Sequence, residues 1–369
     1  MLIGVDASRA NRPQRSGVEW YAYHLIKKLA EIDSNNQYLL YSDSRLRPDL
    51  MPANGNFRER LLRWPFSRLW TLGRLSLEIL SHKPDLLFVP SHTFPLVSGK
   101  KNVITWHDLG YERYPETYTA WELASLKQGA KRAFKLADKI ITISNFTKGE
   151  MVELHKIDPD RIEVIYLGCN HERWQKATPE ALRELLKMME INLPYFVYVG
   201  RLSLRKNLIG LIRIYNRFRE IHREPHNLIL VGSQSTFQNE IDAEIQASPF
   251  KKEIKKLGWL PMEQLPILVS GAVASLYPSF YEGFGLPVIE AMATGTPVLT
   301  STSGSLPEIV GNAGLLADAH DINGFAENMV KLIEDRRLRE KMIAAGLIRS
   351  KLFNWQTCAE KTLQVFKSV

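Results

Sequence analysis

Hydrophobic residues along this chain gather in short continuous runs that alternate with polar loops and amphipathic helices. The first run, 2–7, is followed by a segment at 18–32 whose apolar side chains recur near helical spacing. Strand-like runs of the same kind follow at 38–41, 86–89, 103–106, 140–143 and 164–167. Their β-branched and aromatic residues are continuous and do not alternate with polar ones, which is typical of parallel strands buried on both faces by helices.

The pattern restarts after a polar stretch at 170–193, which contains a predicted helix at 180–190. Further predicted strands lie at 195–199, 228–231, 273–277 and 297–300, with helices at 208–221 and 355–366. With 369 residues, the chain also exceeds what one hydrophobic core usually supports. We therefore predict an α/β fold of two doubly wound, Rossmann-like domains, 1–175 and 176–354, that face each other across a cleft.

Composition excludes several classes of protein. Hydrophobic residues make up 45% of the chain and charged residues 24%, as in ordinary globular proteins, and no long apolar run predicts a membrane-spanning helix. The first residues read as a strand and not as a signal peptide. Because Cys169 and Cys358 are the only cysteines, a disulfide framework is excluded and a cytoplasmic location is expected. The absence of a Cys/His cluster with ligand spacing predicts no metal site.

The net charge of +8 favours anionic partners, such as phosphorylated small molecules, anionic membranes or nucleic acid. We expect no nucleic acid partner, because no recognisable binding module is present. The segment 58–74 interleaves basic and aromatic side chains, namely Arg58, Arg60, Arg63, Arg68 and Arg74 with Trp64, Phe66 and Trp70. This mixture suits peripheral contact with a membrane surface, and a solvated helical face with a few core aromatics is the alternative.

The most informative loop follows the predicted strand at 273–277. Gly283 and Gly285 flank Phe284 there and let backbone N–H groups approach a ligand closely. Pro287 fits the first position of the next helix, whose N-terminus adds partial positive charge. The loop is therefore predicted to hold an anion or a sugar hydroxyl.

Two carboxylates lie in this same segment, Glu282 in the loop and Glu290 in the helix. A carboxylate accepts hydrogen bonds from two neighbouring hydroxyls, so the pair is suited to hold two sugar rings of one nucleotide sugar. Taken singly, Glu282 also reads as an exposed loop carboxylate, and Glu290 as a residue that complements the helix dipole.

A basic loop at 200–207 follows the predicted strand at 195–199. Arg201 and Lys206 lie in it between a strand end and a helix start. Arginine binds phosphate with two parallel hydrogen bonds, and lysine is a compact point charge for the same task. Together they are suited to neutralise a diphosphate leaving group, and a solvated basic loop is the alternative.

Two loops of the first predicted domain carry further candidates. Gly17 precedes the helix at 18–32, where a backbone N–H group can meet a phosphate, and the arginines of this loop would serve either donor or acceptor. His107 follows the strand at 103–106 and can hydrogen-bond a sugar hydroxyl or transfer a proton, with Asp108 orienting it. No Gly-x-Ser-x-Gly motif indicates a nucleophile elbow.

Taken together, these segments resemble family 4 of the retaining glycosyltransferases, which have the GT-B fold. The most specific match is the segment from Glu282 to Glu290 with Gly-Phe-Gly-Leu-Pro inside it, and the second is 200–202 followed by Lys206 and Asn207. The segments 107–108, 143–147 and 305–308 match as well, so the resemblance covers nearly the whole chain. The overall pattern is most similar to mannosyltransferases of surface-polysaccharide assembly.

The resemblance implies roles for the candidates. Arg201 and Lys206 would bind the donor diphosphate, Glu290 the ribose, Glu282 and the glycine loop the transferred sugar, and His107 would line the reaction centre. The implied donor-binding set is Gly17, Arg201, Lys206, Trp259, Leu260, Glu282, Gly283, Phe284, Gly285, Leu286 and Glu290, and the implied catalytic set is His107, Glu282, Arg201 and Lys206. The last helix, 355–369, would return to pack on the first domain.

The chain departs from the family pattern at two places. Ser16 stands before Gly17 where two glycines are common, and 167–170 reads Leu-Gly-Cys-Asn in place of Asn-Gly-Val-Asp. Both differences concern the fine geometry around the donor and not the fold.

The expected activity is retaining, metal-independent and cofactor-free transfer of a hexose by front-face attack. The expected donor is GDP-mannose, and the expected acceptor is a hydroxyl of a glycan or lipid-linked oligosaccharide at the inner membrane face. The alternatives are a UDP-hexose donor, a nucleotide-sugar epimerase or hydrolase, and a non-catalytic nucleotide-sugar-binding protein. A Rossmann oxidoreductase is disfavoured, because no Gly-x-Gly-x-x-Gly follows the first strand.

Overall fold

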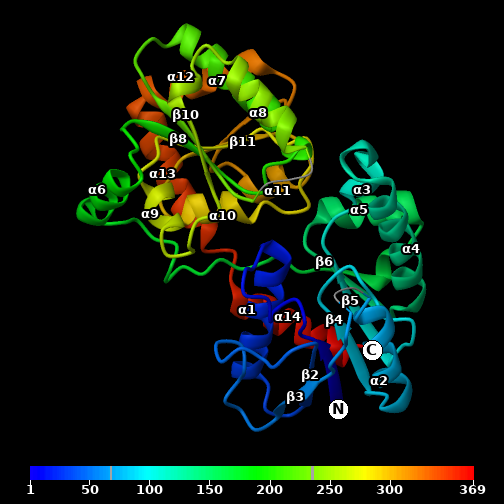
Figure 1. The fold of residues 1–369 in the computed structure, drawn as a ribbon. Helices are drawn as coiled ribbons and strands as arrows, with labels where there is room; N and C mark the ends of the chain where they lie inside the picture. The colour runs from blue at the N-terminus through cyan, green and yellow to red at the C-terminus, as the bar shows by residue number, and fades with distance from the viewer. Residues whose placement is uncertain (67–68, 234–236) are drawn as a thin grey trace. The chain divides into compact units, whose positions relative to one another are not determined.

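The computed structural model describes residues 1–66, 69–233 and 237–369 (Figure 1). The chain divides into two compact units, Met1–Gly168 with Asn354–Val369, and Cys169–Phe353. The division falls between Gly168 and Cys169, whereas the sequence prediction placed it between residues 175 and 176. The backbone N–H of Cys169 donates to the carbonyl of Phe353 over 3.1 Å, so the chain pairs with the second unit as soon as it leaves the first.

Within its described residues, the first unit contains a sheet of seven parallel strands in the order β3-β2-β1-β4-β5-β6-β7. The strands are β1 Leu2–Asp6, β2 Gln37–Ser42, β3 Phe57–Leu61, β4 Leu86–Val89, β5 Lys101–Trp106, β6 Lys139–Thr142 and β7 Ile162–Val164. Strand β4 is buried at every position, as its continuous apolar sequence predicts. Strand β3 was not predicted, because Arg58, Glu59 and Arg60 make this edge strand polar and exposed.

The helical segments of the first unit are α1 Gly17–Ile32, η1 Thr71–Leu75, α2 Ser76–Ser81, α3 Gly110–Arg113, η2 Pro115–Thr117, α4 Ala120–Leu136, α5 Asn145–His155, η3 Pro159–Arg161 and α14 Trp355–Lys367. The last helix, α14, packs against α1 although the two lie at opposite ends of the chain (Figure 1). It also contributes Phe366, whose ring lies 5.0 Å from that of Phe88 in β4.

The second unit, in the part that the structure describes, holds a six-stranded parallel sheet in the order β10-β9-β8-β11-β12-β13. Its strands are β8 Tyr195–Val199, β9 Asn227–Val231, β10 Ile254–Gly258, β11 Ser275–Tyr277, β12 Val298–Ser301 and β13 Leu315–Ala317. The helical segments are α6 Pro179–Met188, η4 Leu204–Lys206, α7 Leu208–Ile221, α8 Gln238–Ala247, η5 Lys251–Glu253, α9 Leu265–Ser270, α10 Leu286–Ala293, α11 Leu306–Val310, α12 Ile322–Glu334 and α13 Arg336–Ser350. Helices α7 and α12 pack against each other, as do α10 and α13. The predicted class of two doubly wound α/β domains is confirmed.

Candidate functional site

An ion pair joins two loops at the carboxyl edge of the second sheet. Lys206 is the last residue of η4, after β8, and Glu282 lies in the loop after β11. The Lys206 ammonium contacts Glu282 Oε2, and the two side chains are only 16% and 13% exposed. The hydroxyl of Ser279 donates to the other carboxylate oxygen, Oε1, over 3.0 Å. Both carboxylate oxygens are therefore held by partners, and the lysine presents a partly desolvated positive charge beside them.

The backbone after Glu282 is fixed from behind by Ser305. Its backbone N–H donates to the Glu282 carbonyl over 3.0 Å, and its hydroxyl lies 2.9 Å from the carbonyl of Phe284. Gly285 then takes a φ of +102°, which lets the chain turn into α10 without the strain that a side chain would bring. Leu286 is the first residue of α10, so Pro287 occupies the second helical position, whereas the sequence analysis placed it at the first. The loop thus delivers its backbone to the N-terminus of a helix, a place suited to anions.

Glu290 is half-buried in the middle of α10. Burial raises the pKa of this carboxyl to about 8, and the nearby positive charge of Arg173 opposes that rise. At neutral pH the side chain therefore carries a proton in a large part of the molecules and can both donate and accept a hydrogen bond. That combination matches a pair of ribose hydroxyls, each of which is also donor and acceptor.

Arg201 and Trp259 follow β8 and β10 at the same edge of the sheet. The Arg201 side chain is exposed, and within the described residues it makes no ion pair, while its own carbonyl accepts a hydrogen bond of 3.0 Å from Tyr198. Trp259 is 52% exposed and Leu260 is 8% exposed, so the indole is presented to solvent and the leucine anchors it. Among the hydrogen bonds and ion pairs of the described residues, none joins Arg201 to the pair of Lys206 and Glu282.

His107 is buried at the end of β5 in the first unit. Its Nε2 lies 3.1 Å from the carbonyl of Pro90, and its backbone N–H donates to Nε2 of His92 over 3.2 Å. A proton on Nε2 satisfies the carbonyl, which leaves Nδ1 as an acceptor. Burial lowers the pKa of the ring, so the neutral form that this pattern requires is favoured. Asp108 Oδ1 accepts from the backbone N–H of Gly110 over 3.0 Å, at the start of α3.

Gly17 is the first residue of α1, with open space where a side chain would stand. The preceding Ser16 N–H donates to Glu19 Oε2 over 3.1 Å, which caps the helix locally. The three arginines of this loop pair inside the first unit: Arg9 with Glu19, Arg12 with Asp43 and Arg15 with Asp49, at 3.7, 3.2 and 2.8 Å. Arg15 has the most buried side chain of the three, and the expectation that these arginines serve the donor or the acceptor stays a prediction.

The segment 58–74 divides into a structural and an exposed part. Trp70 is buried and donates to the carbonyl of Leu62 over 2.8 Å, and Arg60 and Arg74 both bind Glu78. Trp70 is therefore not available as a surface anchor and fits the alternative of a core aromatic, while Arg60 and Arg74 are ion-paired. Arg58 and Arg63 are exposed, Phe66 is 66% exposed, Trp64 is half-buried, and Arg68 lies outside the described residues.

Sequence reasoning gave no role to three residues that organise the site. Ser279 and Ser305 hold Glu282 and its backbone, and Asn207 bonds to the loops after β11 and β13. A small polar residue placed just after an apolar strand is the available signal for all three, but such residues are common in loops.

Neither a metal cluster nor a membrane span is evident in the residues described. No group of three or more His, Cys, Asp or Glu is placed to hold a metal ion in the described ranges. No described helix is long and apolar enough to cross a membrane.

Two family models match the chain, Glycosyltransferase Family 4 over residues 15–173 and Glycosyl transferases group 1 over residues 189–348. The O-antigen chain mannosyltransferase B of Escherichia coli is 32% identical over 342 residues, which cover 93% of this chain and 86% of that protein. The O-antigen chain mannosyltransferase RfbU of Salmonella typhimurium is 27% identical, over 75% of this chain and 72% of that protein.

Solved structures with little sequence identity share the fold. HepE of Anabaena in complex with UDP-glucose superposes with a TM-score of 0.77 at 18% identity, covering 100% of this chain and 99% of that one. WaaG, a glycosyltransferase involved in lipopolysaccharide biosynthesis, superposes with a TM-score of 0.75 at 14% identity, covering 99% of each chain. The strength of the match to the E. coli mannosyltransferase, with a family model over each half, shows that this chain belongs to the group 1 and family 4 glycosyltransferases of GT-B fold.

Proposed function

We propose that this glycosyltransferase moves mannose from GDP-mannose to a hydroxyl of a glycan or lipid-linked oligosaccharide, with retention of the anomeric configuration. The observation that carries the proposal is the half-buried pair of Lys206 and Glu282 beside the N-terminus of α10. A diphosphate carries the charge that would draw Lys206, and the carboxylate so released can accept hydrogen bonds from a sugar. Mannose is favoured because two relatives of the chain are O-antigen mannosyltransferases.

In this proposal, Arg201 and Lys206 bind the diphosphate, and Glu290 binds the ribose. Glu282 and the backbone of 283–285 hold the transferred sugar, with Leu286 beginning the helix behind them. Trp259 and Leu260 are placed near the base. From the first unit, His107 offers its Nδ1 acceptor to a sugar hydroxyl, and Gly17 offers a backbone N–H to phosphate.

We propose front-face attack for the chemical step. The acceptor hydroxyl approaches from the side on which the diphosphate departs, forms the new C–O bond as the old one breaks, and gives its proton to the leaving phosphate oxygen. Arg201 and Lys206 stabilise the negative charge that grows on that leaving group, the part that a metal ion plays in other transferases. Activity should therefore persist when a chelator is added, and a strict manganese requirement would contradict this part.

The acceptor is proposed to be presented at the inner face of a membrane, with the protein cytoplasmic and peripheral. Arg58, Arg63 and Phe66 support this, because two exposed cations and an exposed aromatic ring suit an anionic interface.

A donor screen tests the assignment most directly. The melting temperature would be measured with GDP, UDP and ADP and with their hexose conjugates, each at a large excess over the protein. We expect GDP-mannose and GDP to raise it by several degrees, since a ligand at 100 times its Kd stabilises by about 2.7 kcal/mol. A response to UDP conjugates alone would replace the donor by a UDP-hexose and leave the transferase assignment intact.

Product analysis separates transfer from the other chemistries. With donor and a mannose-terminated acceptor, the product should retain the donor's anomeric configuration by NMR. Rapid release of GDP with no acceptor present would indicate a hydrolase, and conversion of the donor sugar with no GDP release would indicate an epimerase. Binding without any turnover would leave only a nucleotide-sugar-binding protein.

A further inference from the structure

Asn207 occupies a backbone position that few residues adopt. It follows Lys206, separates η4 from α7, and has a φ of +57°, in the left-handed region where asparagine and glycine are favoured. Its side chain is 5% exposed, so its carboxamide needs partners within the protein.

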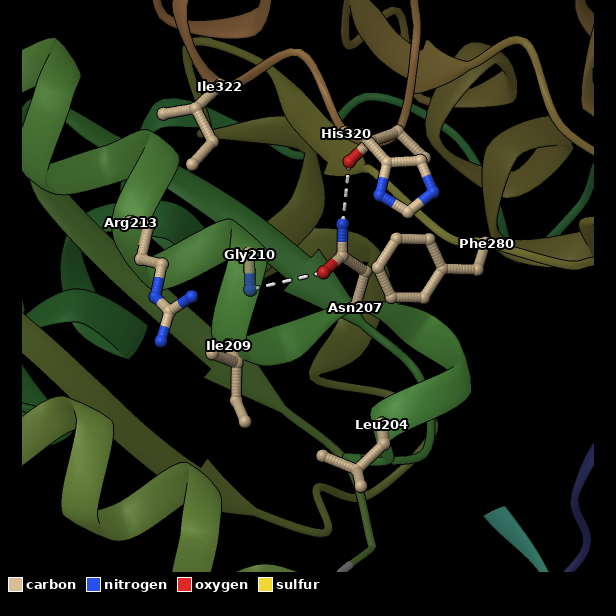
Figure 2. Close-up of a pocket in the computed structure, with 9 residues that line it drawn as sticks. Leu204, Asn207, Ile209, Gly210, Arg213, Phe280, His320 and Ile322 are labelled. Atoms are coloured by element: carbon tan, nitrogen blue, oxygen red, sulfur yellow. Dashed lines mark hydrogen bonds between the residues drawn. The ribbon is translucent and has the colours of Figure 1, made fainter. Parts of the chain in front are cut away.

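Every polar atom of that carboxamide is engaged. Its Oδ1 accepts from the backbone N–H of Gly210 over 3.1 Å and so caps α7. Its Nδ2 donates to the carbonyl of Pro278 over 3.0 Å and to that of Ala319 over 2.9 Å. One side chain thereby joins three segments, those after β8, β11 and β13. Figure 2 shows its bond to Gly210 at the start of α7. Gly210 makes room for it, because a Cβ there would lie 2.1 Å from Asn207 Oδ1.

A pocket borders the side chain of Asn207. A pocket of about 300 Å³, lined by Leu204, Phe280 and Ile322 among others, lies against the carboxamide (Figure 2). Interdigitated side chains normally fix the relative positions of neighbouring loops. Around Asn207, the hydrogen bonds that cross between the three loops add to that packing.

Two of the three joined loops, those after β8 and β11, carry the ion pair of Lys206 and Glu282. Lys206 directly precedes Asn207, and Glu282 lies four residues after the bonded Pro278. The backbone N–H of Phe280 also donates to the carbonyl of Arg205 over 3.1 Å, so the two loops already lie side by side at this point. Movement of one loop relative to the other would change the separation between the lysine and the carboxylate.

We infer that Asn207 is a positioning residue of the donor site, whose carboxamide sets the placement of Lys206 relative to Glu282 by tying the loops after β8, β11 and β13 together. The inference rests on the proposed function, in which Lys206 binds the donor diphosphate. Asn207 itself touches no reacting atom in this role. Its left-handed backbone turns the chain into α7, and its two N–H bonds hold the neighbouring loops in register with the lysine.

The test compares two helix caps replaced by the same residue. Asn207→Gly keeps the left-handed backbone and removes all three side-chain bonds. Asp335→Gly, the matched control, removes the N-cap of α13, whose Oδ1 accepts from the backbone N–H of Leu338 over 2.9 Å in the same unit. GDP and UDP affinity would be measured by calorimetry, guanosine affinity by NMR, and melting temperature by calorimetry for both variants and the wild type.

We expect Asn207→Gly to weaken binding of the nucleoside diphosphate about tenfold, the size expected from losing two loop-fixing hydrogen bonds. Guanosine affinity should stay within twofold, because guanosine lacks the phosphates that Lys206 binds. In turnover, the KM for the donor should rise more than kcat falls. The control Asp335→Gly should leave the diphosphate affinity, the guanosine affinity and the KM for the donor unchanged. Equal diphosphate affinity in Asn207→Gly and wild type would overturn the inference and leave the proposed function standing.

Hydrogen exchange of the ligand-free protein gives a readout that does not need the donor. Peptides that cover 278–282 and 318–320 should exchange faster in Asn207→Gly than in wild type and the control. Unchanged exchange at both segments would overturn the inference. If wild type binds neither GDP nor UDP, the proposed function fails, and the exchange result alone still decides whether Asn207 positions these loops.

Discussion

Each unit has a basic loop after its first strand, β1 in the first unit and β8 in the second. The arginines and lysine of the two loops have different surroundings. In the first unit, the loop before α1 places Arg12 and Arg15 against Asp43 and Asp49, acids of the neighbouring strand end and loop. In the second unit, the loop before α7 leaves Arg201 exposed and pairs Lys206 with Glu282, a residue of the glycine-rich loop. Cations between a strand and a helix are the sequence signal in both loops. In the first unit they form ion pairs that stabilise the fold, and in the second they form a candidate ligand site.

Partners distant in sequence make this difference. Arg15 is 5% exposed, its Nε donates to the carbonyl of Ala10 over 2.8 Å, and its guanidinium lies 4.2 Å from the centre of the Tyr23 ring. An acid, a carbonyl and an aromatic face thus hold this cation in place within the first unit. Lys206 is paired with the carboxylate of Glu282, which an anion can replace.

The largest effect is expected from breaking the second loop's ion pair. Lys206→Ala should lower kcat by about 100-fold or more, because it removes a cation aimed at the departing diphosphate. Glu282→Ala should lose transfer to a similar extent and keep most of the nucleotide affinity, since Lys206 remains. Both would be measured as mannose transfer, with GDP binding by calorimetry.

Arg12→Ala is the matched control for this experiment, because it removes an exposed paired cation from the corresponding loop of the first unit. It should leave the transfer rate within about twofold, as exposed ion pairs contribute little. Wild-type rates in Glu282→Ala would remove that residue from the site, and a large loss in Arg12→Ala would erase the contrast between the loops.

The second prediction separates stability from binding. Arg15→Ala should lower the free energy of unfolding by about 1 kcal/mol, since it removes a buried side chain with its bond to the Ala10 carbonyl and its cation–π contact, and should leave GDP affinity unchanged. Arg201→Ala should do the reverse, weakening GDP binding about tenfold with no loss of stability. Urea unfolding would measure the stability of both variants, and calorimetry their GDP affinity. An unstable Arg201→Ala with normal GDP affinity would contradict the assignment of Arg201 to the diphosphate.

The sequence predicted most of the strands of both units, because continuous apolar runs form buried parallel strands. The predicted helix at 208–221 matches α7 Leu208–Ile221, and the run at 195–199 matches β8. Strand β13 Leu315–Ala317 was missed, because three residues are too short to show a pattern. Strand β7 was expected at 164–167 and occupies Ile162–Val164, since its edge position allows the polar Glu163.

The site was predictable as residue types but not as contacts. Lys206 and Glu282 were both named, yet 76 residues separate them and no local rule states that they pair. Trp70 shows the converse, because its aromatic character suggested an exposed anchor and its indole N–H instead satisfies the carbonyl of Leu62 in the interior. Pairing and burial depend on how the loops fold against one another, which spacing along the chain does not contain.

The third prediction concerns Glu290, whose pKa burial raises to about 8 from an ordinary value of 4.5. As pH rises through that window, the unfolded chain releases this proton while the folded protein keeps it, so the group lowers stability progressively toward pH 8. Glu290→Gln removes the effect and should melt about 2 °C or more above wild type at pH 8.5, with a smaller difference at pH 5. The control Glu334→Gln, at an exposed carboxylate of the same unit, should show no such pH dependence. A difference that is independent of pH would indicate that burial does not shift Glu290.

The smallest effect is expected for membrane binding by the exposed part of 58–74. This is another basic segment for which the sequence left two interpretations open. Arg58→Gln with Arg63→Gln should weaken binding to phosphatidylglycerol vesicles about three- to tenfold at low salt, since each cation near an anionic surface contributes up to about 1 kcal/mol. Phe66→Ser should add to the loss by removing an exposed ring. The pair Arg336→Gln and Arg337→Gln lowers the net charge equally from exposed positions of the second unit, so it separates local contact from overall charge. If both double variants lost the same amount of vesicle binding, the segment would be a solvated face. On a docking surface, the position of the removed cations would matter and not only their number.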